Sequence, residues 1–298
     1  MRRIMECETE SGKSIKQILQ NKYRMSAALI TALKKNPNGI MVNGEKKYVN
    51  YILQGGDKLT VTFEETGSVN IEPVSMRLDI LYEDEYILAV AKPADMAVHV
   101  SHGNVNNTLS NGVLYYLNNK YNEPYKFHAV TRLDKNTSGI VVIAKTAYIH
   151  DALSRSLREK TFFKEYTAVV CKRLTGSGEI NAPIARESES IITRCVREDG
   201  LFAVTRYESA VPGDDYSLVR LCPVTGRTHQ LRVHMAYIGH PIAGDDLYGA
   251  EKIKENRHLL HCGRVVFQHP VTGNKLEIVH KVPDCFLEYI YKNKKTID

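Results

Sequence analysis

The chain has 298 residues with a formal net charge of +6 at pH 7, and its 43% hydrophobic and 25% charged residues exclude a largely disordered protein. The longest aliphatic run, Gly139–Ala144, is far too short to cross a bilayer, and the start of the chain lacks the apolar middle of a signal peptide. We therefore expect a cytoplasmic protein that is not inserted in a membrane.

The first 63 residues carry the net charge of the whole chain. They hold eleven Lys or Arg and five Asp or Glu, which leaves the remainder neutral overall. Apolar residues at helical spacing predict helices within "SIKQILQNKYRMS" and "SAALITALKK", each opened by a Ser that can cap it. The next stretch, "IMVNGEKKYVNYILQGGDKLTVTF", predicts strands joined by turns at Asn43-Gly44 and Gly55-Gly56. We expect a small α/β unit.

Basic residues recur near the ends of these two predicted helices, and they are Lys16, Lys22, Arg24, Lys34 and Lys35. Such cations could neutralise the phosphates of a nucleic acid, although a solvated basic surface explains them equally well. The helix–helix–"GIMVNG"–strand pattern ending in "GDKLTV" resembles the small alpha-L-type RNA-binding domain, and this resemblance favours RNA as the partner. We predict this domain over residues 1–65 and a linker over residues 66–77, where turn formers gather.

Residues 78–298 alternate between strand-like runs and two helical segments, at about residues 108–118 and 146–160. The runs are "LDILYEDEYILAVAKP", "GIVVIAKT", "FFKEYTAVVC", "FAVTRYESAV" and "YSLVRLCPV". This pattern predicts an α+β domain with a mixed central sheet and a few flanking helices. The second helix has an apolar face, so Arg155 and Arg158 should face water or a ligand.

A single carboxylate, Asp134, stands among turn residues in "HAVTRLDKNTSGIVVIAKT", just before a buried strand. An isolated loop Asp is commonly only a turn former that binds its own backbone. Here the neighbouring Arg132 favours an ionised carboxyl group, because a nearby guanidinium lowers its pKa. An ionised carboxylate on a rigid, exposed turn can act as a nucleophile.

The stretch "CPVTGRTHQLRVHMAYIGHPIAGDDLYG" predicts a helix over about residues 229–238, capped by Thr228 and ended by Gly239. Arg227 lies at the entrance of this helix and Arg232 one turn inside it. Both could point at an anion bound by the positive end of the helix. Read as structure alone, they would be surface cations or partners of a structural acid.

Strand alternation in "FFKEYTAVV" places Lys164 and Tyr166 on one face of the sheet. A tyrosine in a sheet is usually part of the core, but its phenol gives it a polar end if the face borders a cleft. Further along, His258, His261 and Cys262 come nearest to a metal-ligand cluster. Because no second cluster supplies further ligands, the sequence predicts no metal site, and the six scattered cysteines should be reduced thiols.

Four of these stretches together resemble the successive motifs of the RluA-type pseudouridine synthases, and they are "RLDKNTSGIVVIAKT", "KEYTAVV", "VTGRTHQLRVHMAYIGHPIAGDDLYG" and "HLLHCGRVVFQHPVTG". With the N-terminal domain included, the arrangement is similar to the members that act on the large ribosomal subunit. The resemblance covers nearly the whole chain and implies a mostly antiparallel central sheet. One departure is Thr131, where the family usually has His or Asn.

The resemblance implies an enzyme that converts uridine in RNA to pseudouridine. The bond from the base nitrogen to the ribose breaks, the base turns, and it is rejoined to the sugar through carbon 5. Asp134 would act at the sugar as a nucleophile or as a base, and these two roles stay open. Arg232 would pair with Asp134 and keep it charged, Tyr166 would stack on the uracil ring and help remove the proton at carbon 5, and Arg132 would fill the space left by the flipped base.

The expected partner is therefore RNA, with ribosomal RNA of the large subunit favoured over transfer RNA, and no metal, cofactor or dinucleotide is implied. Nothing in the sequence demands more than a monomer. A non-catalytic RNA-binding factor for ribosome assembly is the main alternative. A glycosidase acting on an N-glycosidic bond is a more remote one, because such enzymes prefer paired carboxylates and no second acid stands out near Asp134.

Overall fold

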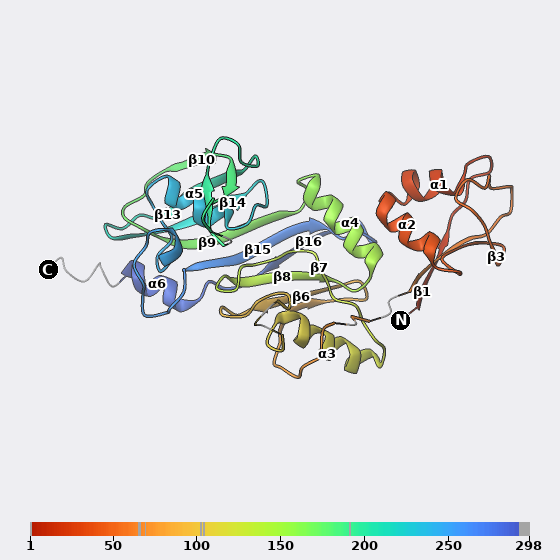
Figure 1. Cartoon of the computed structure of the whole chain (residues 1–298), viewed down its shortest axis with the longest axis horizontal. Helices are drawn as coiled ribbons and strands as arrows, with labels where there is room; N and C mark the ends of the chain where they lie inside the picture. The colour runs from red at the N-terminus through yellow and green to blue at the C-terminus, as the bar shows by residue number, and fades with distance from the viewer. Residues whose placement is uncertain are drawn as a thin grey trace.

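The structure is a computed structural model of the chain, and it describes residues 2–64, 67–68, 70–101, 103, 105–190 and 192–291. Residues 65, 66 and 69, at the predicted domain boundary and linker, lie outside the described residues. The exact bounds of the two predicted domains therefore stay predictions. Figure 1 shows the N-terminal elements grouped at one end of the molecule, beside a much larger sheet.

The N-terminal group has its own sheet and its own hydrophobic core. Its elements are β1 (Arg2–Cys7), α1 (Ile15–Gln17), the π-helical η1 (Ile18–Lys22), α2 (Ala27–Lys35), β2 (Ile40–Val42), β3 (Glu45–Lys46) and β4 (Leu59–Glu64). The strands are ordered β1-β4-β2-β3 and pair antiparallel. The side chains of Ser14 and Ser26 cap the two helical segments, as the sequence predicted.

Two local features of this group differ from the sequence-based expectation. Strand β1 was not predicted, because Arg-Arg-Ile-Met-Glu-Cys has no regular alternation of polar and apolar residues, yet it pairs with β4 along its whole length. The segment between β3 and β4, which was predicted to contain a strand, forms only an isolated bridge between Ile52 and Ser14. The predicted turn at Asn43-Gly44 is present, and both residues have positive φ angles, 52° and 82°, as a two-residue hairpin turn requires.

A ten-stranded sheet dominates the rest of the described chain, and its central order is β10-β13-β14-β9-β15-β8-β6-β5. Its strands are β5 (Asp79–Glu83), β6 (Ile87–Lys92), β7 (His128–Ala129), β8 (Ser138–Ala144), β9 (Phe163–Cys171), β10 (Ser177–Asn181), β13 (Val204–Val211), β14 (Tyr216–Pro223), β15 (Leu260–Gln268) and β16 (Lys275–Val279). Strands β15 and β8 pair in parallel, whereas the other neighbours pair antiparallel. The predicted α+β class with a mixed, mostly antiparallel sheet is confirmed.

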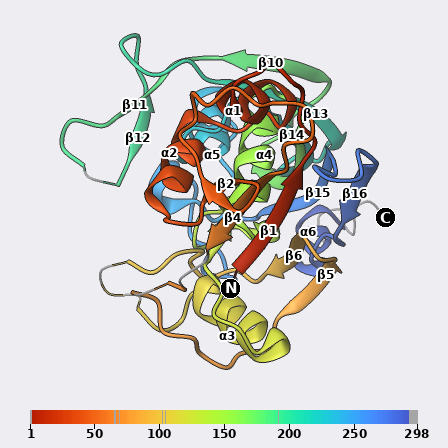
Figure 2. The same ribbon diagram turned by 90° about the vertical axis from the view of Figure 1, so that its right-hand side faces the viewer.

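Helices lie against this sheet and a hairpin extends from it. The remaining elements are α3 (Leu109–Tyr121), α4 (Ala147–Arg158), β11 (Ile184–Arg186), β12 (Arg194–Val196), α5 (Gln230–Tyr237), the 3-10 turn η2 (Asp246–Tyr248) and α6 (Asp284–Tyr291). Helices α3 and α4 agree with the two predicted segments to within a few residues. Figure 2 shows β11 and β12 projecting sideways from the rest of the molecule. None of the described helices is long and apolar enough to span a membrane.

Helix α4 joins the N-terminal group to the large sheet. The Ser26 amide donates a hydrogen bond to the Asp151 carboxylate (2.9 Å), and Arg24 forms an ion pair with Glu159 (2.6 Å). Arg155, which was predicted to face water or a ligand, instead donates to the Arg24 carbonyl oxygen. These contacts position the N-terminal group beside α4 through polar bonds.

Candidate active site

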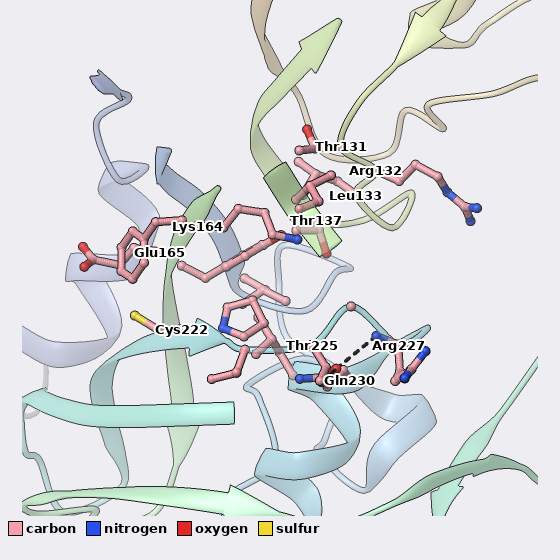
Figure 3. A pocket seen from close by; sticks show the side chains of 18 of the residues that line it. Thr131, Arg132, Leu133, Thr137, Lys164, Glu165, Cys222, Thr225, Arg227 and Gln230 are labelled. Carbon is pink, nitrogen blue, oxygen red and sulfur yellow. Dashed lines mark hydrogen bonds between the residues drawn. The ribbon is translucent and has the colours of Figure 1, made fainter. Parts of the chain in front are cut away.

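One cavity of about 1000 Å³ lies where the centre of the large sheet meets two loops. It is lined by the loop before β8, by the start of β9, and by the segment that connects β14 to α5. Figure 3 shows side chains from all three segments facing the same space. Asp134, Tyr166 and Arg232, which the sequence analysis placed in one catalytic site, all line this cavity. The fold therefore brings together three residues that are up to 98 positions apart.

The loop that carries Asp134 is fixed at several points. The Thr137 amide donates to the Asp134 carbonyl oxygen (3.1 Å), and the Thr137 hydroxyl is hydrogen bonded to His258 (2.8 Å). At Gly139, where φ is 115°, a Cβ atom would lie 2.2 Å from a carbonyl oxygen of β15, so only glycine fits. The Asp134 side chain keeps 31% of its surface exposed. The carboxylate is thus accessible on a rigid support.

Thr131, the departure from the family pattern, is buried in this loop. Its hydroxyl accepts a hydrogen bond from the Val142 amide (3.0 Å) on the neighbouring strand β8. Thr131 therefore has a packing role at the base of the loop. Its hydroxyl serves as the hydrogen-bond acceptor for a backbone amide of β8.

Lys92 supports the same loop from below, and the sequence analysis did not identify it. Its buried amine donates to the carbonyl oxygens of Pro93 (2.7 Å), Met96 (2.8 Å) and Lys135 (3.0 Å). Burial lowers the pKa of Lys92 to about 7, and the Asp134 charge opposes this shift. The available signal was a lysine that ends the otherwise apolar, fully buried run of β6.

Arg232 bridges two carboxylates. Its Nη1 lies 3.3 Å from Asp134 Oδ2, while Nε and Nη2 each lie 2.7 Å from one oxygen of Asp245. The side chain of Asp245 is only 1% exposed, and the Tyr248 ring lies 4.9 Å from the guanidinium carbon. The predicted pairing of Arg232 with Asp134 is present in the geometry. Arg232 is closer to Asp245, however, and binds it through two hydrogen bonds. Asp245 lies within the quoted "GDDLYG" stretch, where the sequence analysis did not consider it as a site residue.

The start of α5 differs from the prediction. The helix begins at Gln230, its N-terminal boundary residue is His229 with a φ angle of 57°, and Thr228 makes no capping bond. Just before the helix, the Gln230 side chain accepts hydrogen bonds from the Arg227 amide (3.0 Å) and the Thr225 hydroxyl (2.7 Å), and the Gln230 amide donates to the Arg227 carbonyl oxygen (3.1 Å). A turn closed by Gln230 therefore stands where the Thr228 cap was predicted. Figure 3 shows the Arg227–Gln230 bond. Arg232, which was expected to point at an anion bound at this helix start, instead contacts the carboxylates of Asp245 and Asp134.

His229 lies next to the Asp134 carboxylate as a result of this backbone geometry. Its Nε2 lies 3.7 Å from Asp134 Oδ2, and its Nδ1 is hydrogen bonded to the Tyr248 hydroxyl (2.8 Å). Burial lowers the pKa of His229, although the Asp134 charge acts in the opposite direction. We expect a neutral imidazole near pH 7. From the sequence, His229 was expected only as the first residue of this helix.

Tyr166 lies on the floor of the cavity and is 6% exposed. Burial, together with the neighbouring Cys262 and Asp134, raises the pKa of its phenol well above the ordinary value. The phenol is therefore neutral at physiological pH. It can take part in a proton transfer only as a hydroxyl, which accepts one proton while it donates another. Its ring belongs to the main hydrophobic core and is held there by the surrounding strands.

The predicted RNA-contacting arginines lie at the rim. Arg132 and Arg227 are both exposed and line the cavity, and in Figure 3 the Arg132 guanidinium points away from Leu133 toward the edge of the view. The Arg227 Nε donates to the Phe202 carbonyl oxygen (3.0 Å), so one donor of this side chain is already used.

The five predicted basic residues of the N-terminal group lie outside this cavity. All five are exposed. Lys22 pairs with Glu8 (2.8 Å) and Arg24 with Glu159 (2.6 Å), whereas Lys16, Lys34 and Lys35 make no ion pair with the described residues. Among the described residues, no group of three or more His, Cys, Asp or Glu side chains could hold a metal ion, and all six cysteines are free thiols.

Comparison with known proteins gives a consistent result. Residues 86–237 match the family described as RNA pseudouridylate synthase. The chain is 39% identical over 260 residues to the Bacillus subtilis protein named uncharacterized RNA pseudouridine synthase YlyB, with 86% of each chain covered. It is 36% identical over 250 residues to ribosomal large subunit pseudouridine synthase D of Vibrio cholerae, covering 79% of this chain and 77% of that protein.

Solved structures share the fold. Human RNA pseudouridylate synthase domain containing 1 aligns with a TM-score of 0.58 and 28% identity, covering 76% of this chain and 89% of that chain. Human RNA pseudouridylate synthase domain containing 4 aligns with a TM-score of 0.60 and 22% identity, covering 72% and 93% respectively.

Proposed function

The chain belongs to the RNA pseudouridylate synthase family, and from this membership we propose that its substrate is ribosomal RNA of the large subunit. It is an enzyme that isomerises uridine in RNA to pseudouridine. The choice of ribosomal RNA is supported by relatives that are named for it, such as the Vibrio cholerae protein. Transfer RNA is the alternative substrate.

The choice of RNA is tested by mapping pseudouridine in total RNA from cells with and without the protein. We expect at least one pseudouridine to disappear from large-subunit ribosomal RNA, and purified protein to restore it on the unmodified RNA. Loss of a site only in transfer RNA would contradict the proposed substrate. Unchanged RNA in the cells together with inactive purified protein would support the assembly-factor alternative.

The observation that carries the mechanism is the partly exposed Asp134 carboxylate, held 3.3 Å from Arg232 at the bottom of a nucleotide-sized cavity. The guanidinium orients the carboxylate, which can attack the sugar as a nucleophile or take a proton from it as a base. The N1–C1′ bond breaks, the base turns, the C5–C1′ bond forms, the proton on carbon 5 leaves, and N1 takes up one proton, so that the product is an isomer of the substrate. The reaction is redox-neutral and needs no co-reactant.

Tyr166 supports the base in this mechanism. Its buried ring offers an apolar face for stacking, and its neutral hydroxyl can relay the proton from carbon 5. A Tyr166→Phe variant with full turnover would contradict the relay. Because a paired uridine must first leave its helix, at a cost of a few kcal/mol, Arg132 at the cavity rim is suitably placed to occupy the vacated space.

Asp245 is a second carboxylate near Asp134, but it does not support the glycosidase alternative. A glycosidase with two acids needs the second carboxylate to activate water or to protonate the leaving group. Both Asp245 oxygens are bound by Arg232 at 2.7 Å, and the side chain is 1% exposed, so it cannot approach a substrate. Release of pseudouridine-containing RNA without free uracil is the expected product pattern.

We further propose that the N-terminal lysines supply salt-dependent affinity for RNA. Replacing Lys16, Lys34 and Lys35 together with Gln should weaken RNA binding and reduce the slope of log affinity against log salt by up to about 2 to 3, because each phosphate contact contributes about 0.7 to 0.9. Binding measured across a salt series checks this. A matched variant with Lys252, Lys275 and Lys281 changed to Gln should bind like the unchanged protein, and equal slopes for the two variants would contradict the proposal.

The location and the oligomeric state are also proposals. We propose that the protein is cytoplasmic, which the six free thiols of the described chain support, and that it is a monomer. Light scattering on the purified protein, and fractionation of cells that produce it, test these two points.

A further inference from the structure

Lys164 faces the cavity beside Tyr166. The two residues lie two positions apart on β9, so their side chains leave the same face of the sheet, with Cα atoms about 6.6 Å apart. The intervening Glu165 points the opposite way in Figure 3 and lies 3.7 Å from Arg264 instead. The Lys164 amine therefore reaches into the space that the uracil ring would occupy.

The amine has no charged partner among the described residues. It makes no hydrogen bond or ion pair there, although its side chain is partly buried, and burial lowers its pKa. The ionisable neighbour that affects the pKa of Lys164 is the Cys262 thiol. Burial raises the pKa of Cys262 to about 12, so this thiol is neutral. A partly buried amine that is aimed into a cavity without a partner is costly to the fold, which points to a ligand atom as its missing partner.

The position of Lys164 relative to Asp134 indicates which ligand atom this is. Tyr166 lies opposite Cys262 of β15, which in turn pairs with Gly139 at the start of β8, just after the loop that carries Asp134. Lys164 lies opposite Val265, further along β15, so it is farther from that loop than Tyr166 is. The sugar must sit at Asp134 and the ring over Tyr166. In uracil the atom opposite N1 is carbon 4, and its carbonyl oxygen O4 points away from the sugar.

We propose that Lys164 donates a hydrogen bond to O4 of the target uracil and stabilises the negative charge of the base while it is detached from the ribose. When the N1–C1′ bond breaks, its electron pair stays on the base and spreads to the O2 and O4 oxygens. A fixed donor at O4 stabilises this charge more than it stabilises the neutral uridine, so it accelerates the reaction. The inference rests on the uridine chemistry assigned above.

The first test is Lys164→Met in the full chain, assayed under single-turnover conditions on the RNA that the unchanged enzyme modifies. We expect a loss of about 100-fold in rate, the size typical for one donor to a developing anion, with RNA affinity and its salt dependence unchanged. Lys275→Met, a change at an exposed lysine outside the cavity, is the matched control and should be fully active. A melting temperature of Lys164→Met at or above that of the unchanged protein would exclude misfolding as the cause.

The second test identifies the atom. With 4-thiouridine at the target position, sulfur replaces O4 and accepts hydrogen bonds poorly, so the Lys164→Met variant and the unchanged enzyme should differ by less than about threefold. With 2-thiouridine, the difference of about 100-fold should persist. Equal effects of Lys164→Met on all three RNAs would overturn the assignment to O4, and a loss confined to RNA affinity would indicate a phosphate contact instead. If the unchanged enzyme were itself inactive on uridine, the assigned function would fail rather than this inference.

Discussion

Asp134→Asn should lower the rate of pseudouridine formation by on the order of 10⁴-fold or more, while RNA affinity stays within a few fold. The amide has nearly the same shape as the carboxylate, but it neither attacks carbon 1′ of the sugar nor accepts a proton from it. The protein should stay folded for two reasons. The Asp134 side chain is 31% exposed, and its contact with Arg232, at 3.3 Å, is longer than the contact of Arg232 with Asp245. Single-turnover kinetics and a separate binding assay check the two parts.

The control for this variant is Asp214→Asn. Asp214 is 86% exposed and pairs with Arg173 on the surface, so this change should leave turnover and binding intact. Asp134→Ala should behave like Asp134→Asn. Wild-type turnover by either Asp134 variant on its cognate RNA would refute the assigned chemistry, whichever role the carboxylate has.

The candidate site residues could be predicted because local sequence patterns determine the direction of their side chains. Turn residues before a buried strand expose Asp134, strand alternation directs Tyr166 to one face of β9, and helical spacing places Arg232 inside α5. The family resemblance then supplied the expectation that these three residues meet. The structure brings them to one cavity, and their catalytic roles remain predictions until variants are measured.

The supporting residues could not be predicted, because their partners are distant in the chain. Lys92 binds the Lys135 carbonyl oxygen 43 positions away, and Asp245 meets Arg232 only because η2 folds back onto α5. The same limitation applies to Arg24, which looked like a free basic residue but pairs with Glu159, 135 positions away. Such ion pairs depend on tertiary packing, and no local spacing indicates them.

Errors in local structure have a similar cause. Thr228 is a good cap by residue type, but the Gln230 side chain binds the Arg227 amide and displaces the expected arrangement. The short strands β7, β11 and β12 have two or three residues each, so they carry too little alternation to be recognised. Strand β8 was predicted well because burial of the whole strand dominates its sequence.

The second large effect is expected at Arg232. Replacing it with Met leaves the Asp245 carboxylate buried without a partner, and breaking a buried ion pair in this way typically costs about 3 to 5 kcal/mol of stability. Turnover should also fall, on the order of 100-fold, because Asp134 loses the guanidinium that lies 3.3 Å away and orients its carboxylate. Chemical denaturation and single-turnover assays measure the two losses. The control is Arg173→Met. The Arg173 side chain is 59% exposed and pairs with Asp214 on the surface, so this change should alter stability by less than about 0.5 kcal/mol.

A double variant separates these two roles of Arg232. Arg232→Met combined with Asp245→Leu replaces the buried ion pair with apolar side chains, which is often neutral for stability. We therefore expect most of the 3 to 5 kcal/mol to return, while turnover stays about 100-fold low, because Asp134 still lacks its cation. Recovery of turnover together with stability would mean that Arg232 acts only by holding Asp245, and that the contact of 3.3 Å with Asp134 has no catalytic consequence.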